Sequence, residues 1–112
     1  MKYNSSCFHL ISGLQMLSLV LASGITDASV AAIAYSFTKL ELLDLSGSSI
    51  GDSGIGIICN MFSRTLTRLL LALCPNITSS GIQFATAQLP HLELLSFGNN
   101  LEVLPTVRSR RF

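Results

Sequence analysis

The stretch LTRLLLALCPNITSSGI, residues 66–82, carries the pattern that decides the fold. Leucines at its first, fourth and sixth positions lead through a short polar segment to an isoleucine, after which apolar residues return at helical spacing. The same order occurs in LQMLSLVLASGITDASV (14–30) and LELLDLSGSSIGDSGI (40–55), and its leucine part begins again at Leu92. The copies start at 14, 40, 66 and 92, so the period is 26 residues. Such a period predicts stacked strand–loop–helix units.

The repeat predicts an α/β fold in which the fourth and sixth residues of each copy point inward and form a ladder of leucines. Asp27, Asp52 and Ser79 are predicted to be the helix N-caps. Small residues beside them, such as Gly54 and Gly81, are expected to let the chain bend tightly into each helix. The predicted organisation is a lead-in from the end of a preceding helix (1–13), repeats (14–39, 40–65, 66–91 and a partial 92–98) and a divergent, disordered basic tail (99–112).

The copies resemble the cysteine-containing leucine-rich repeats of F-box proteins, and their sequence pattern is most similar to that of plant members. The third copy keeps the cysteine of that pattern as Cys74, whereas Ala22 and Ser48 replace it in the first and second. The resemblance implies a leucine-rich-repeat solenoid, a horseshoe arc of about three and a half repeats with a parallel sheet on its concave face and helices on its convex face. It also implies a protein-interaction array that selects targets for a cullin-based ubiquitin ligase, the SCF complex. Residues 1–112 contain no F-box, so we expect a fragment of a longer array or of a truncated product; a repeat scaffold unrelated to ubiquitin is the alternative.

GSSIGDSG (47–54) matches two serine-hydrolase signatures, G-x-S-x-G and G-D-S-G. Ser49 stands where the other repeats carry Gly24 and Asn76, and Ser48 and Ser53 stand in the cysteine and small-residue columns of the repeat. This placement favours a role in turn geometry over catalysis. The chain has only two histidines, and His91 lies at a repeat boundary, away from these serines. We therefore expect no enzyme activity and no cofactor. No metal is expected either, because the three cysteines include no C-x-x-C pair.

Charged residues make up only 12% of the chain, and the formal net charge is +1. Arg108, Arg110 and Arg111 stand near its end, so the remainder is mildly acidic and is not expected to bind nucleic acid. No apolar run reaches the roughly 20 residues of a membrane span. Cys7, Cys59 and Cys74, an odd number, favour an intracellular protein of the cytoplasm or nucleus. Reading residues 10–24 as a signal peptide, with a glycan on Asn76, is the alternative.

The outward residues of the strands predict a face for a protein partner, because leucines and a methionine stand there beside acidic side chains. This face is expected to suit a partner of apolar and basic character. Arg68, its single cation, would anchor an acidic group or would pair with Asp44 or Glu41. The exposed apolar residues could instead pack against a missing neighbour, and uncapped ends of the array could allow self-association. We call this set the open face: Gln15, Met16, Ser18, Glu41, Leu42, Asp44, Thr67, Arg68, Leu70, Glu93, Leu94 and Ser96.

Overall fold

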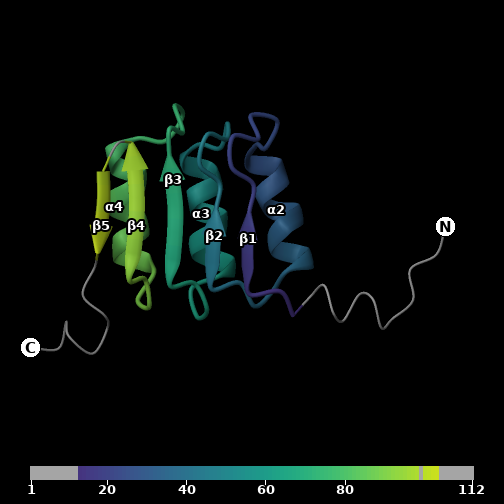
Figure 1. Ribbon diagram of the computed structural model, residues 1–112. Helices are drawn as coiled ribbons and strands as arrows, with labels where there is room; N and C mark the ends of the chain where they lie inside the picture. The colour runs from purple at the N-terminus through teal and green to yellow at the C-terminus, as the bar shows by residue number, and fades with distance from the viewer. Residues whose placement is uncertain (1–12, 99, 104–112) are drawn as a thin grey trace, which may run out of the picture.

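The computed structural model describes residues 13–98 and 100–103, which form one sheet with three helices against one of its sides (Figure 1). The α/β class predicted from the repeat is confirmed, and the arrangement is compatible with a leucine-rich-repeat fold. Sheet order follows chain order from β1 to β5. The elements are β1 (Met16–Ser18), α2 (Asp27–Ser36), β2 (Leu42–Asp44), α3 (Asp52–Met61), β3 (Arg68–Ala72), α4 (Ser79–Gln88), β4 (Leu94–Gly98) and β5 (Asn100–Val103).

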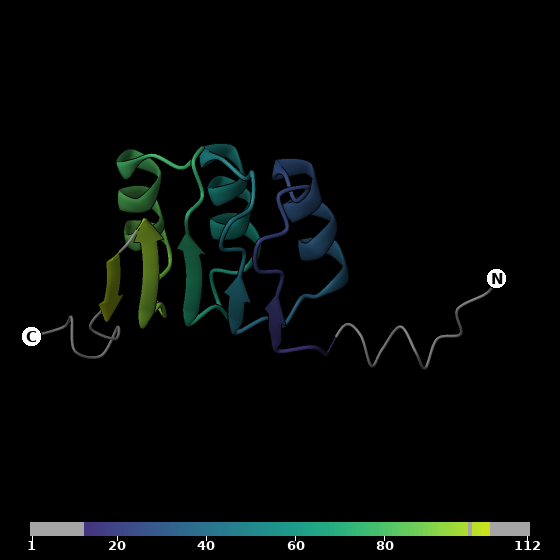
Figure 2. The ribbon, with the colours of Figure 1, turned by 45° about the horizontal axis from the view of Figure 1, so that its top comes forward.

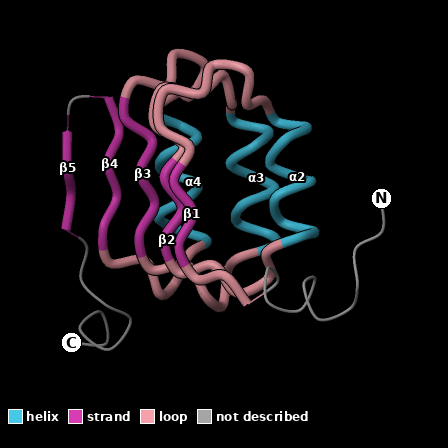
Figure 3. Tube along the Cα trace, turned by 45° about the vertical axis from the view of Figure 1, so that its right-hand side comes forward, coloured by secondary structure: helices cyan, strands magenta, loops and turns pink. Residues whose placement is uncertain are grey.

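The sequence period is also the register of the sheet. Strands β1 to β4 pair in parallel, and Met16, Leu42, Arg68 and Leu94 stand opposite one another in successive strands. Each parallel connection therefore passes through a helix on the same side of the sheet and brings the chain to the start of the next strand (Figure 2). The tube in Figure 3 shows the result as two layers, with strands on one side and helices on the other, joined by loops at both ends.

The core lies between these layers and consists of equivalent residues from successive repeats. Leu43, Leu69 and Leu95 form the first ladder and are at most 1% exposed. The helices close the core from the other side with apolar residues at helical spacing, such as Ile55, Ile58 and Phe62 in α3. In the first repeat, Leu17 and Leu19 are only half-buried, because among the described residues no repeat packs on their outer side.

The prediction of a disordered tail over 99–112 is wrong for residues 100–103, which form β5. This strand runs antiparallel to β4, with Asn100 opposite Phe97 and Val103 opposite Leu94. Gly98 adopts the left-handed backbone, φ 61°, which lets the chain reverse tightly after β4. The N–H and C=O groups along this edge of β4 then form hydrogen bonds with the returning segment. Residues 1–12 of the lead-in predicted over 1–13, and the rest of the tail, lie outside the described residues.

None of the helices in the described part of the chain is long and apolar enough to cross a membrane.

Position within the ladder should set the cost of truncating a leucine. Leu69→Ala is expected to lower the free energy of unfolding by about 2–5 kcal/mol, because Leu69 is fully buried between two neighbouring strands. Leu17→Ala, the matched change at the end of the same column, should cost clearly less because Leu17 is already half-exposed. Urea unfolding of the full chain followed by circular dichroism measures both, and equal losses would contradict a core built by stacking.

Candidate protein-binding face

The strands bring most of the predicted open face together on the side of the sheet opposite the helices. In β3 the side chains alternate, with Leu69 and Leu71 buried under the helices and Arg68, Leu70 and Ala72 half-buried on the other side. Residues of the same columns in β1, β2 and β4 share this orientation because the register is continuous.

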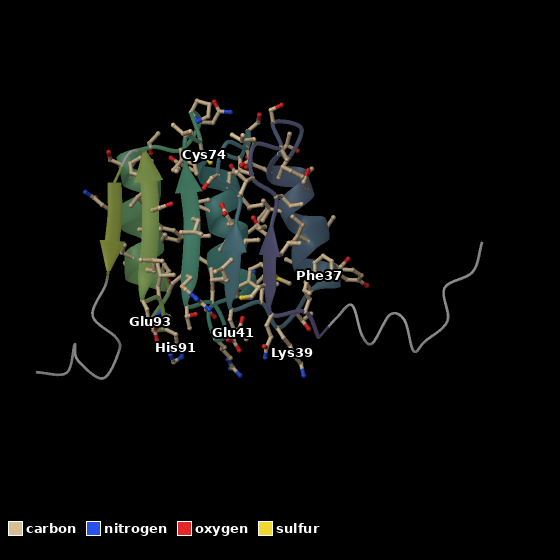
Figure 4. The ribbon with its side chains drawn as sticks, viewed as in Figure 1. Phe37, Lys39, Glu41, Cys74, His91 and Glu93 are labelled. Atoms are coloured by element: carbon tan, nitrogen blue, oxygen red, sulfur yellow. The ribbon has the colours of Figure 1, made fainter. Side chains whose placement is uncertain are left out.

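Four polar members of the open face lie just before the strands begin, along one edge of the sheet. Figure 4 labels two of them, Glu41 and Glu93, at the lower ends of β2 and β4. Thr67 stands between them, since its N–H donates to the Glu41 carbonyl at 2.8 Å and its carbonyl accepts from the Glu93 N–H at 2.7 Å. Glu41 likewise donates its N–H to the carbonyl of Gln15.

Ser96 is not available to a partner, contrary to the prediction. It is only 8% exposed, and its hydroxyl oxygen accepts the N–H of Leu71 at 3.1 Å. Ser96 also stands opposite Leu101 of β5, a strand that the sequence did not predict. The open face therefore consists of the other eleven residues.

The charged side chains of the open face differ in the hydrogen bonds and ion pairs that they form. Asp44 accepts the N–H of Ser46 at 3.1 Å and the hydroxyl of Ser18 at 3.4 Å. Arg68 makes neither of the predicted pairs, with Asp44 or with Glu41, and over residues 13–98 no carboxylate forms an ion pair with it. Among the side chains of residues 13–98, the half-buried guanidinium thus contacts no carboxylate directly.

The apolar part of the face crosses all four parallel strands. Met16 is 59% exposed, and Leu42, Leu70 and Leu94 are half-buried. Three of these four lie in one register row, with Arg68 between two leucines. Exposed apolar side chains gathered in this way, beside charged ones, are typical of a surface that contacts another protein.

The helix caps are one residue earlier than predicted. Thr26, Gly51 and Thr78 are the N-caps, and Asp27, Asp52 and Ser79 are the first helical residues. The two carboxylates reach across to the next repeat instead. Asp27 accepts the N–H of Gly51 at 2.8 Å, and Asp52 accepts the N–H of Thr78 at 3.0 Å and its hydroxyl at 2.5 Å. Each aspartate therefore satisfies an N–H group at the start of its neighbour's helix.

The glycines one repeat further on leave room for these carboxylates. A Cβ built on Gly54 would lie 2.5 Å from Oδ1 of Asp27, and one built on Gly81 would overlap Oδ1 of Asp52. In the first repeat the same column holds Ser29, whose hydroxyl accepts the N–H of Thr26 at 3.0 Å. Close approach, rather than a bend into the helix, explains the two glycines.

The serine and cysteine residues of the loops have structural partners. Ser48 is buried, 3.6 Å from the sulfur of Cys74, and that thiol donates to the Leu45 carbonyl at 3.2 Å. The predictions that Cys59 and Cys74 belong to the core are confirmed, and burial raises the pKa of Cys59 to about 11, so this thiol stays protonated at neutral pH. Over residues 13–98 and 100–103, no three His, Cys, Asp or Glu side chains come together as a possible metal site.

One feature of the loops was missed in the sequence. Leu21 and Leu73 adopt the left-handed backbone, with φ 61° and 57°, and their side chains are 70% and 62% exposed. Gly47, at the equivalent place in the second repeat, was the only signal, because glycine favours that conformation. Beside Leu73 lies an open apolar cavity that also involves Pro75 and Phe97.

The described residues thus form an α/β fold that is compatible with leucine-rich repeats and carries an amphipathic open face. A scan against protein-family models finds no match. The chain is 69% identical over 85 residues to F-box/LRR-repeat protein 17 of Arabidopsis thaliana. That alignment covers 76% of this chain but only 14% of the relative, so the chain spans a small part of the protein it matches. The resemblance to plant F-box/LRR proteins inferred from the repeat is confirmed.

The contact between Asp52 and Thr78 should make stability depend on pH. Hydrogen bonds from the Thr78 hydroxyl and N–H hold the pKa of Asp52 below its ordinary value of 3.8. Because the folded state has the lower pKa, the stabilisation is complete above the unfolded value and is lost as pH falls from 3.8 through the lowered pKa. Asp52→Asn should therefore flatten this acid limb of the melting temperature against pH.

Glu41→Gln is the matched control, since the Glu41 carboxylate accepts no hydrogen bond from a described residue and should leave the acid limb attributed to Asp52 in place. An Asp52→Asn profile that runs parallel to the wild-type profile would show that the carboxylate does not stabilise the next repeat.

Proposed function

We propose that this chain is a non-catalytic protein-interaction module that binds a protein partner on its open face. We propose further that it is a piece of a leucine-rich-repeat solenoid, with repeats at 14–39, 40–65, 66–91 and 92–98. Within a longer protein it would form part of the array that recognises targets of an F-box-type ubiquitin ligase. The observation that carries this proposal is the 69% identity to an F-box/LRR-repeat protein over a segment with a 26-residue register.

The structure supports the binding role through the composition of the open face. A folded chain does not need Met16 or the leucine row on an exposed surface for its own stability, whereas a protein interface uses such residues. Ser48, Ser49 and Cys74 in the loops have structural hydrogen-bond partners, which favours a scaffold over a hydrolase.

Two further proposals concern the location of the chain in the cell and its self-association. An intracellular location, in the cytoplasm or nucleus, is supported by the unpaired thiols of Cys59 and Cys74. Self-association through the β1 end of the stack is supported by the half-buried Leu17, Leu19 and Ile25, whose equivalents in the next repeat are fully buried.

Binding through the open face is testable with surface variants of the full chain. Leu70→Asp should remove the proteins that the wild-type chain retains from a plant extract, because a carboxylate would be placed in the middle of the apolar row. Tyr35→Asp is the control, since Tyr35 is 82% exposed on α2, on the helix side of the sheet. Quantitative mass spectrometry measures the retained set, and equal retention by both variants would argue against this face.

The ubiquitin part of the proposal predicts competition. Added in excess, the chain should lower the modification of a captured protein by a ligase assembled with F-box/LRR-repeat protein 17, while the Leu70→Asp chain should not. An assay with purified ligase measures this. Unchanged modification, with binding intact, would favour a repeat scaffold unrelated to ubiquitin.

A further inference from the structure

Three charged residues stand side by side on the open face, on three neighbouring strands. Glu41 precedes β2, Arg68 begins β3 and Glu93 precedes β4. Backbone hydrogen bonds hold the three residues at the same height along the strands. The Arg68 N–H donates to the Glu41 carbonyl at 3.0 Å, and the Glu93 N–H donates to the carbonyl of Thr67, the residue before Arg68. With about 4.8 Å between strands, the two glutamates are about 10 Å apart along the sheet, with the arginine between them.

The surroundings of Arg68 favour an acidic ligand for it. Its neighbours in the register row are Leu42 and Leu94, and Leu70 follows it on the same face of β3. These leucines withdraw water from the half-buried guanidinium but offer it no hydrogen-bond acceptor. A carboxylate that approaches along the face would find a planar, pre-positioned donor in a partly desolvated place, where such a bond is strong.

The remaining charges do not change this pattern. Asp44, the other acid on the face, already accepts hydrogen bonds from Ser46 and Ser18. The cations Lys39 and Arg64 and the imidazole of His91 are exposed in the loops before the strands, outside the open face, and no described carboxylate forms an ion pair with them. Within the face itself, the order across the strands is negative, positive, negative.

We propose that the partner of the open face presents one carboxylate between two cationic side chains, with apolar side chains on the same surface. This inference rests on the proposed function and specifies its partner. The carboxylate would bind Arg68, the flanking cations would reach Glu41 and Glu93, and the apolar side chains would cover Leu70 and Met16. The expectation of an apolar and basic partner is thereby refined, because a cation stands between the two glutamates and calls for an acidic group on the partner.

The chain itself offers a competing occupant. Val103, paired with Leu94, is followed by nine residues that include Arg108, Arg110 and Arg111, and nine extended residues reach about 30 Å. This segment would supply cations to Glu41 and Glu93, but it has no acidic side chain for Arg68. The two occupants therefore predict different effects of substitutions.

The test begins with random peptides displayed on phage and selected on the full-length chain. Selected peptides are expected to contain an acidic residue flanked by basic and apolar ones. For a synthetic peptide from this pool, Arg68→Gln should weaken binding at least about tenfold, and Arg68→Lys should retain part of the affinity because the charge remains. Replacing the acid of the peptide by lysine should restore binding to Arg68→Glu. Arg64→Gln, a change to a cation outside the face, should leave the affinity unchanged.

Each other outcome overturns the inference in a recognisable way. Peptides lost with Leu70→Asp but retained by Arg68→Gln would refute the acidic anchor and leave the proposed function standing. Failure to select any peptide, or binding insensitive to both changes, would count against the open face altogether. Tighter peptide binding after replacement of the three tail arginines by serine would assign the face to the tail. Circular dichroism of every variant excludes loss of fold as the cause.

Discussion

The carboxylates of Asp27 and Asp52 join the first three repeats at their helix starts, beside the buried leucine ladders that hold successive strands together. The N–H groups at the start of a helix have no partner within the helix and must find one outside it. Here the aspartate of one repeat accepts the N–H of the residue that caps the following helix. Gly54 and Gly81 provide the space, so that successive helices start at matched positions. The leucine ladders lie beneath strands in continuous register, which extends to β4 although Ser79 replaces the aspartate in the third repeat.

The register of the strands also determines which side chains lie next to one another on the open face. Because every repeat presents the same columns, a residue type in one column becomes a row across the sheet. The row that contains Met16 and two leucines is interrupted once, by Arg68. The face therefore combines an apolar surface with a single positive charge within it, and its carboxylates lie mainly along one edge. That distribution is set by the register of the sheet, not by net charge.

Much of this architecture could be predicted from the sequence, because a ladder residue is recognised by its repetition. The leucine columns, the buried isoleucines and the position of Cys74 all follow from the 26-residue period. The caps could not be placed correctly, since Asp52 bonds to Thr78 of the neighbouring repeat, a contact that the sequence of a single repeat does not show. Ser96 was misassigned because its burial accompanies pairing with β5, and that pairing depends on a sheet edge that no periodicity reports. The distinction between Asp44, whose bonds are made, and Arg68 also required three-dimensional contacts.

Ser29 shows that the hydrogen bonds at the helix starts run in one direction along the chain. In the first repeat this hydroxyl accepts the N–H of Thr26, the group that in later repeats bonds to an aspartate from upstream. Ser79 stands where the first two repeats have aspartate, so no carboxylate passes from the third repeat to the fourth. Dependence runs one way, since a repeat completes the helix start of its successor and receives nothing equivalent in return. Loss of Asp27 or Asp52 would thus remove an acceptor from the helix start of the following repeat and leave the preceding repeat unchanged.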